Sequence, residues 1–118
     1  MNRMYSLVLI LILSLSALAL NAGVVDGYMW DDYVIEGSEE LDYEWTFTGG
    51  EIATVYVEGD TSTDLDLFVY DQAGNLIVSD EGDGDACEVE WTPEETTTYI
   101  VRLKNLGDFE NYYYIESN

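Results

Sequence analysis

Histidine is absent from the 118-residue sequence, and cysteine and proline occur once each. Without histidine, a Ser-His triad, histidine acid–base catalysis and histidine-ligated zinc are excluded. A single cysteine also excludes an internal disulfide bond. The sequence therefore contains few of the residues that catalysis commonly uses, and the fold has no disulfide cross-link within the chain.

The single thiol, Cys87, lies in a stretch of alternating residues. Its apolar neighbours at two-residue spacing are Val89 and Trp91, and the residues between them are polar. This spacing places the thiol on the inward face of a strand. We expect a buried, inert thiol that packs as a small apolar group, and the alternative is a disulfide between two chains.

Basic residues are scarce. The sequence has 3 Lys+Arg and 25 Asp+Glu, a formal net charge of −22. This charge repels nucleic-acid phosphates and anionic membrane surfaces, so neither is an expected partner. Cations, basic partners and plain solubility remain as explanations. The sequence also contains Tyr 10 and Trp 3, and an aromatic-rich chain of this kind can build a core rather than stay disordered.

Charged residues are missing from residues 4–22, which follow a short basic start at Arg3 and are mostly apolar. A small-residue end completes the pattern of a secretory signal peptide. We expect residues 1–22 to be this peptide, cleaved after Ala19 or Ala22; the alternative is a retained anchor, although the apolar run is at the short limit for a membrane span. The remaining chain, residues 23–118, has a charge of 2 − 25 = −23. We expect it to be exported to the periplasm, the cell surface or the medium, with no membrane span.

Alternation with a period of two residues dominates the rest of the chain, and no convincing amphipathic helix is present. We expect strands at 43–48, 53–58, 65–70, 76–79, 87–92, 99–104 and 112–116. Short strands separated by Gly, Asp, Asn and Pro are typical of two stacked antiparallel sheets. The prediction is an all-β, antiparallel, jelly-roll-like β-sandwich of about seven to eight strands at 41–118. A segment at 23–40 precedes it and contributes an edge strand at 33–35.

The inward face of these strands is expected to contain eight residues: Leu65, Leu67, Val69, Val89, Trp91, Tyr99, Val101 and Leu103. Asp66 and Phe68 occupy the positions between the first three, and Asp71-Gln72-Ala73-Gly74-Asn75 follows as a tight hairpin connection. If Asp71 pairs with Leu76, the register places Leu67 opposite Asp80, Leu65 opposite Gly82 and Asp64 opposite Asp83.

That register gathers six carboxylates at the end of the hairpin remote from its turn: Asp64, Asp66, Asp80, Glu81, Asp83 and Asp85. Each like-charged pair about 5 Å apart costs roughly 0.8 kcal/mol in water, and a bound cation would relieve this repulsion. Calcium is the candidate cofactor because it accepts several carboxylate oxygens in flexible geometry. Its expected ligands are Asp64, Asp66, Asp80, Asp83 and Asp85, and the alternative is a solvated acidic rim. An EF-hand is excluded, because the twelfth position counted from Asp80 is Trp91.

Aromatic rings on outward faces provide a second candidate site. The rings expected there are Trp30, Tyr33, Phe68, Tyr70, Tyr112 and Tyr114. Together they suggest a platform on which sugars stack, although rings of this kind also fill sheet edges. Carboxylate pairs would suit a glycosidase, but with 25 acidic residues such pairs arise by chance and carry little weight.

Four segments resemble motifs of the bacterial pre-peptidase C-terminal domain. Residues 59–75, GDTSTDLDLFVYDQAGN, are similar to its D-L-D-L-Y-V-Y-D-x-x-G-N hairpin. Residues 98–105, TYIVRLKN, resemble its Y-x-I-x-V-x-N strand, and residues 41–47 and 111–114 resemble its first and last strands. The resemblance covers 41–118 and is to a stand-alone, secreted version of the domain. It implies a jelly-roll-like, non-catalytic sandwich of a kind usually appended to secreted proteases and sometimes calcium-binding or matrix-binding.

The sequence thus predicts an exported, non-catalytic accessory module. Its expected partner is an extracellular or envelope protein or a polysaccharide. Carbohydrate binding through exposed aromatic rings is the alternative function.

Overall fold

The computed structural model describes residues 29–118, so the predicted signal peptide and its cleavage points lie outside the described chain. The strands are β1 (Met29–Ile35), β2 (Glu40–Phe47), β3 (Ala53–Glu58), β4 (Leu65–Tyr70), β5 (Leu76–Asp80), β6 (Ala86–Trp91), β7 (Thr97–Asn105) and β8 (Asn111–Ser117). The all-β prediction is confirmed, and each strand expected from the alternation is present. Within residues 29–118 there is no helix long and apolar enough to cross a membrane.

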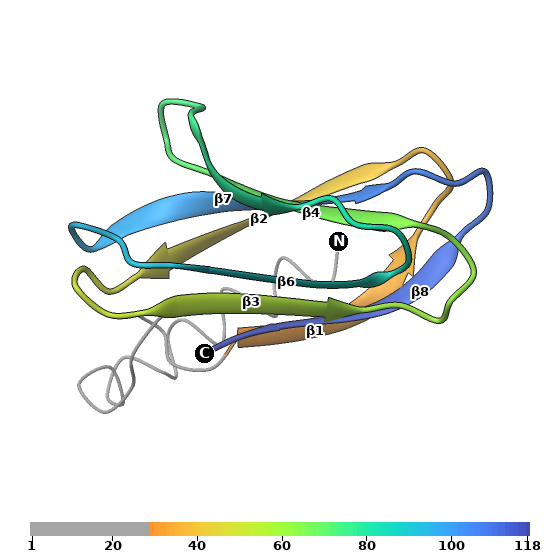
Figure 1. Cartoon of the computed structure of the whole chain (residues 1–118), viewed down its shortest axis with the longest axis horizontal. Coiled ribbons are helices and arrows are strands. Elements are labelled where there is room, and N and C mark those ends of the chain that lie inside the picture. The colour runs from red at the N-terminus through yellow and green to blue at the C-terminus, as the bar shows by residue number, and fades with distance from the viewer. Residues whose placement is uncertain (1–28) are drawn as a thin grey trace.

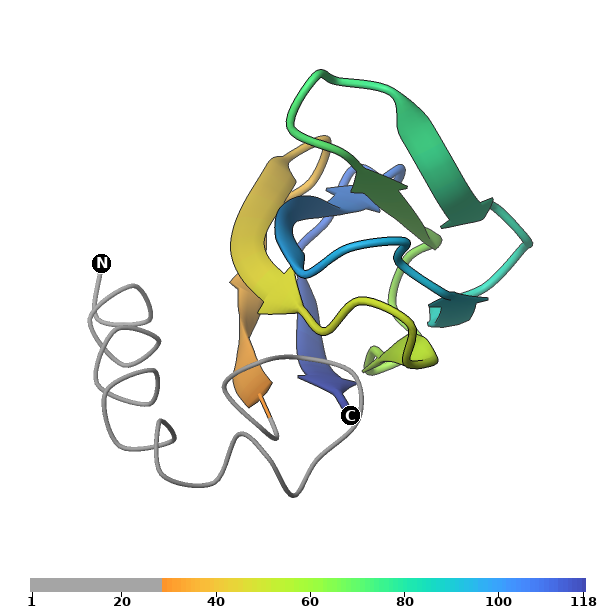
Figure 2. The same cartoon turned by 90° about the vertical axis from the view of Figure 1, so that its left-hand side faces the viewer.

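The strands form two four-stranded antiparallel sheets, ordered β1-β8-β3-β6 and β2-β7-β4-β5. In Figure 1 the layer with β2, β7 and β4 lies above the layer with β6, β3, β1 and β8, and Figure 2 shows the same two layers from one end. This order is that of a jelly roll: apart from the β4–β5 hairpin, consecutive strands pass from one sheet to the other. The predicted fold class is therefore confirmed.

The N-terminal edge strand is longer than predicted. It begins at Met29 rather than at residue 33, and it pairs with β8 along its whole length, from Met29↔Ser117 to Ile35↔Asn111. The first half of this strand was not predicted, because its inward residue is Asp31 and a polar residue there interrupts the apolar alternation typical of a strand. The structure explains this aspartate, since its carboxylate accepts a hydrogen bond from the buried Tyr43.

The core lies between the sheets and consists of the inward residues of the strands. Of the eight residues predicted to face inward, all are buried except Trp91, which is partly exposed and packs edge-on against Phe47 with ring centroids 4.7 Å apart. Cys87 is 2% exposed, and its thiol donates to the carbonyl of Leu65 at 3.0 Å. Burial raises the pKa of this thiol to about 12. The buried thiol is thus confirmed.

Two buried asparagines hold the loops at one end of the sandwich. The side-chain amide of Asn105 donates to three backbone carbonyls, those of Ile35, Glu36 and Phe109. Asn111 accepts from the Asp60 amide at 2.9 Å and donates to the Thr63 carbonyl at 3.2 Å. Since buried polar groups are costly unless paired, these bonds fix the loops against the ends of β7 and β8.

The β4–β5 turn differs by one residue from the predicted register. Leu67↔Asp80 and Val69↔Val78 pair as expected, but Tyr70 rather than Asp71 lies opposite Leu76. The Asp71 carboxylate is in the turn and accepts from the amides of Ala73 and Asn75 at 3.0 and 2.8 Å. An irregularity in the β4–β5 pairing absorbs the extra residue, as β-bulges do.

A buried hydrogen-bonded chain joins the two sheets. The Tyr43 hydroxyl of β2 lies 2.6 Å from the Tyr113 hydroxyl of β8 and donates to the Asp31 carboxylate of β1 at 3.0 Å. Burial, followed by the influence of Tyr113 and Asp31, raises the pKa of Tyr43, so this hydroxyl stays a neutral donor. The chain satisfies polar groups that would otherwise be buried without partners.

We expect Tyr43→Phe to lower the free energy of unfolding by about 1–3 kcal/mol, because it leaves the Tyr113 hydroxyl and the Asp31 carboxylate without this partner. Tyr56→Phe is the matched control. It also removes a tyrosine hydroxyl, but this one donates to the Glu58 carboxylate on the exposed side of the sheet. Urea unfolding followed by tryptophan fluorescence measures both. Equal losses in the two variants would contradict the role given to the buried chain.

Candidate functional site

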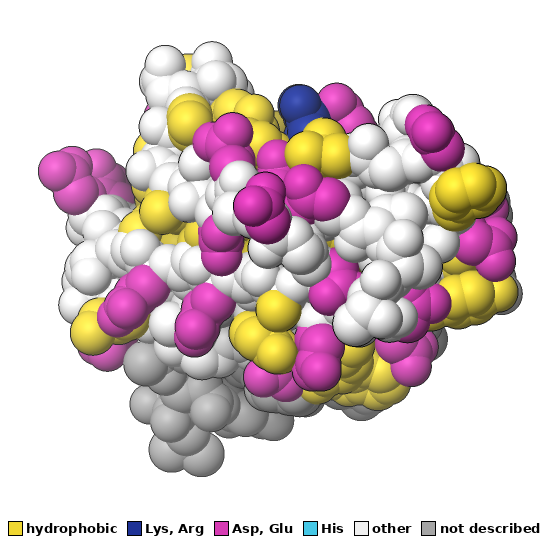
Figure 3. All heavy atoms as spheres, turned by 45° about the vertical axis from the view of Figure 1, so that its right-hand side comes forward, with side chains coloured by type: hydrophobic (Ala, Val, Ile, Leu, Met, Phe, Trp, Pro, Cys, Tyr) yellow, Lys and Arg dark blue, Asp and Glu magenta, His cyan; other side chains and the backbone are white. Residues whose placement is uncertain are grey.

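The six predicted carboxylates lie at the end of the β4–β5 hairpin remote from its turn, and we call this region the acidic end. Figure 3 brings the right-hand side of Figure 1 forward and shows acidic side chains spread over that view, with Lys or Arg visible only near its upper edge. The predicted pairing is wrong at this end, because β5 stops at Asp80. Leu65 is therefore not opposite Gly82, nor Asp64 opposite Asp83, and the Leu65 amide donates instead to the Gly84 carbonyl at 2.9 Å.

Two of the five predicted calcium ligands, Asp80 and Asp85, accept hydrogen bonds from backbone amides at the acidic end. Asp80 accepts from the Glu88 amide at 2.9 Å and from the Gly82 amide at 3.2 Å. Asp85 is 9% exposed, and its carboxylate accepts from the Thr61 amide. Both side chains therefore have a structural role in the loops that join β3 to β4 and β5 to β6.

Asp64 and Asp66 differ, because each has a buried Oδ1 atom without a hydrogen-bond partner. Asp66 lies on the outer side of β4, and Asp64 lies immediately before this strand begins. Asp66 is 5% exposed, and burial, then Asp64, Glu81 and Asp80, raise its pKa to about 6, while Lys104 opposes the shift. The fifth predicted ligand, Asp83, is exposed.

The structure therefore divides the predicted calcium ligands into three kinds: two that bind backbone, two with unpartnered buried oxygens, and one in solvent. Among residues 30–118, no group of three or more acidic or cysteine side chains is placed so that it could hold a metal ion. The arrangement offers two adjacent oxygen donors at Asp64 and Asp66.

We expect Asp66→Asn to be more stable than the unmodified protein at pH 7 in chelator, by on the order of 1–2 kcal/mol. Because the folded-state pKa of about 6 lies above the ordinary 3.8, the folded protein binds this proton more tightly than the unfolded chain does. Stability from this group is present below about pH 4 and is lost as the pH rises through about 6. The advantage of Asp66→Asn should therefore vanish at low pH.

Unfolding in urea at a series of pH values measures this difference. Asp83→Asn is the matched control, because it removes an equal charge from an exposed position. An unmodified protein that is more stable than Asp66→Asn at pH 7 would contradict the assignment of a buried, repelled carboxylate.

The outer face of the other sheet carries aromatic and acidic side chains in alternation. On it, Tyr114 of β8 pairs with Asp32 of β1 on one side and with Glu58 of β3 on the other. Directly opposed residues point to the same side of a sheet, with Cβ atoms about 4.5–5.5 Å apart. A tyrosine ring thus has a carboxylate on each neighbouring strand.

The next row across the same sheet reverses the order. Trp30 pairs with Glu116, Glu116 with Tyr56, and Tyr56 with Glu88. Burial raises the pKa of Tyr56, and the carboxylates of Glu58, Glu88 and Glu116 raise it further. Acidic and aromatic side chains therefore alternate both along and across the strands. We call the surface made by these two rows and Tyr112 the aromatic–acidic face.

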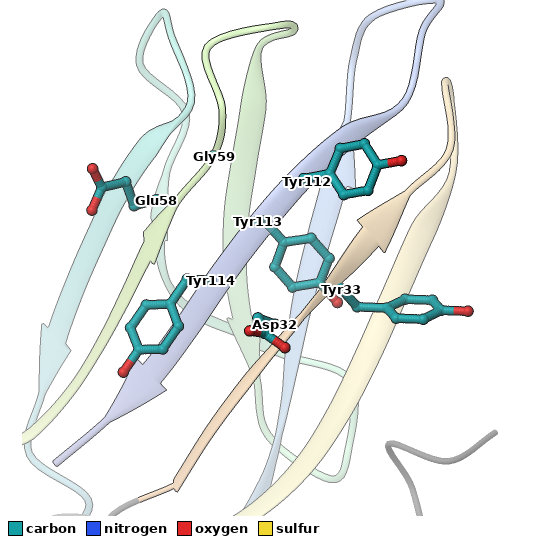
Figure 4. A pocket seen from close by; sticks show the side chains of 7 residues that line it. All are labelled: Asp32, Tyr33, Glu58, Gly59, Tyr112, Tyr113 and Tyr114. Atoms are coloured by element: carbon teal, nitrogen blue, oxygen red, sulfur yellow. The ribbon is translucent and has the colours of Figure 1, made fainter.

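A cleft of about 440 Å³ lies on this face. It is lined by Asp32, Tyr33, Glu58, Gly59, Tyr112, Tyr113 and Tyr114. Figure 4 shows that Asp32 and Glu58 come from strands on either side of β8. Tyr112 is 58% exposed, and Trp30 stacks on Tyr114 with ring centroids 6.3 Å apart. The cleft combines open ring surface with two carboxylates from separate strands.

The six rings predicted as one platform are divided between the two sheets. Trp30, Tyr33, Tyr112 and Tyr114 are on β1 and β8, whereas Phe68 and Tyr70 are on β4. The expectation of an open Phe68 is wrong, because this ring is 8% exposed. It stacks against Tyr70, and the Lys104 ammonium lies 5.0 Å from its centroid.

No pattern in the sequence indicates that Tyr56 and Glu88 share a face with the rings of β1 and β8. Their shared face depends on β8 lying between β1 and β3, and these strands are distant in the chain. Alternation alone indicates which residues share a face of one strand. It does not indicate which strands are neighbours.

No family model matches the sequence, and no curated protein is similar to it. Among solved structures, the pre-peptidase C-terminal domain of a Bacillus anthracis collagenase is similar, with a TM-score of 0.66 and 9% identity over 76% of this chain and 88% of that one. PliG of Aeromonas hydrophila, a periplasmic inhibitor of g-type lysozyme, has a TM-score of 0.58 and 13% identity over 77% and 84%. The Yersinia pseudotuberculosis-derived mitogen has a TM-score of 0.57 and 14% identity over 78% and 85%.

At these identities the likeness is one of fold. The chain is a jelly-roll β-sandwich related in architecture to the pre-peptidase C-terminal domain, which is the family its hairpin and strand motifs resemble.

Proposed function

We propose that this protein is an exported, non-catalytic binding module of the kind represented by pre-peptidase C-terminal domains, and that it binds its partner through the aromatic–acidic face. The fold supports the proposal, as do the absence of histidine from the sequence and the expected signal peptide. The observation that carries it is the cleft of about 440 Å³ with exposed Tyr112 and two carboxylates from separate strands. Exposed aromatic rings around a concave surface are typical of binding sites.

Carbohydrate binding is the second candidate function at the same face. The stacked pair Trp30 and Tyr114, with planes 29° apart, favours it because it presents ring surface next to hydrogen-bonding carboxylates. A sugar would stack on the rings and donate its hydroxyls to Asp32 and Glu58.

We expect ligand-induced changes in amide chemical shifts to be confined to β1, β3 and β8. The titration uses three probes: cellohexaose, a peptide of alternating serine and arginine, and a peptide of alternating serine and glutamine. Tyr112→Ala should weaken the binding of whichever probe is bound by about fivefold, the loss expected for one exposed stacked ring. Tyr70→Ala is the matched control, because this ring lies on the opposite sheet. Shift changes centred on β4 and β7 would contradict the proposal.

A weak calcium site at the acidic end is a separate part of the proposal. The unpartnered buried oxygens of Asp64 and Asp66 support it, because hard oxygen donors suit calcium better than softer metals. Two carboxylates leave most of the coordination to water, so we expect an affinity of about 10⁻⁴–10⁻³ M. Calcium would there neutralise two charges that repel each other and hold the β3–β4 connection against β4.

We expect calcium at about ten times its dissociation constant to raise the Tm of the unmodified protein by about 6–11 °C relative to chelator. Asp64→Asn combined with Asp66→Asn should remove this response, whereas Asp83→Asn should keep it. Differential scanning calorimetry provides the measurement. A Tm that does not change with calcium would eliminate the metal site and leave the binding face untouched.

A further inference from the structure

The charge of the molecule is divided unevenly between its two sheets. The basic residues of the described chain are Arg102 and Lys104, and both are on β7. Arg102 donates to Asp42 at 2.8 Å, and the Lys104 ammonium lies 3.4 Å from Glu40. Both cations therefore neutralise acids of their own sheet. The sheet that contains the aromatic–acidic face has no basic residue among residues 29–118.

The arrangement of this face suits cations more than neutral ligands. Arginine and lysine side chains are attracted to the faces of tyrosine and tryptophan rings, and a carboxylate beside the ring supplies the counter-charge. Tyr114 lies between Asp32 and Glu58, and Tyr56 lies between Glu116 and Glu88. A guanidinium group on either ring would thus have a carboxylate on both sides within one strand spacing, about 4.8 Å.

A neutral sugar would use the rings but would gain little from the negative charge of the acids. Four carboxylates on one face, Asp32, Glu58, Glu88 and Glu116, repel one another in the free protein. A cationic partner relieves this repulsion, and a neutral partner does not.

We infer that the aromatic–acidic face binds a basic protein surface, and that an arginine side chain of the partner enters the cleft over Tyr114 between Asp32 and Glu58. The inference rests on the proposed binding function of this face and specifies its partner class. Charge complementarity decides it: an acidic and aromatic sheet face requires a partner with exposed arginine or lysine. Arginine fits better than lysine because its planar group stacks on a ring while it donates to carboxylates at its edges.

The test measures fluorescence anisotropy of a labelled peptide of alternating serine and arginine at physiological ionic strength. We expect the double variant Asp32→Asn, Glu58→Gln to bind about tenfold more weakly than the unmodified protein. Glu44→Gln with Glu94→Gln is the matched control, because it removes the same charge from exposed positions on β2 and in the β6–β7 connection. It should change binding by less than about twofold, since exposed charges farther away than a Debye length of about 8 Å are largely screened.

A second variant, Tyr114→Leu, keeps a large apolar side chain and removes the ring together with its hydroxyl, which donates to Glu116 at 2.6 Å. It should weaken the binding of the arginine peptide several-fold more than the binding of a lysine peptide, because the guanidinium loses its stacking surface. Amide chemical shifts in the unmodified protein provide an independent readout that needs no variant. Peptide-induced changes should be largest at Asp32, Glu58 and Tyr114.

Equal weakening by the two double variants would overturn the inference, because it would mean attraction to the overall charge only. Binding of cellohexaose without binding of the arginine peptide would also overturn it, while it would leave the proposed binding function of the face intact. Binding of neither ligand would overturn both.

Discussion

Each strand of this protein must give one of its faces to the layer between the two sheets, and that layer has no space for an unpaired charge. With 25 Asp+Glu in the sequence, this requirement decides where the acids lie. They occupy outer faces, turns and loop ends, or they accept backbone hydrogen bonds where burial is unavoidable, as Asp85 does. Asp31 faces inward and bonds the Tyr43 hydroxyl. Only Asp64 and Asp66 have a buried carboxylate oxygen without a partner in the described chain.

The three aspartates between Thr63 and Asn75 therefore have different physical roles although they belong to one short segment. Asp71 closes the hairpin by accepting two backbone amides, so it belongs to the turn. Asp66 lies on a central strand and is buried by its neighbours although it faces outward. Asp64, just before this strand, likewise has a buried carboxylate oxygen without a hydrogen-bond partner. A repeated residue type in a strand thus does not imply one shared function.

The sequence predicted the strands, the inward residues and the hairpin register from Leu67 to Val69, because these follow from local alternation and turn chemistry. It missed the shift at Tyr70, since the hydrogen bonds by which Asp71 becomes part of the turn are not visible in the pattern. It also missed the end of β5 at Asp80, where the glycine-rich segment leaves the sheet. The buried Phe68 was mistaken for an open ring because its cover comes from Lys104 of the neighbouring strand. Periodicity could not predict contacts between strands that are distant in the chain, because it describes each strand separately.

The pairing of β1 with β8 has a consequence for how the molecule is assembled. In its sheet β1 has a single neighbour, β8, the last strand of the described residues. Without β8 in place, β3 and β6 can still pair, but β1 has no partner in the sheet and the aromatic–acidic face is incomplete. The binding surface therefore cannot grow strand by strand from β1, because it is complete only once β8 lies between β1 and β3.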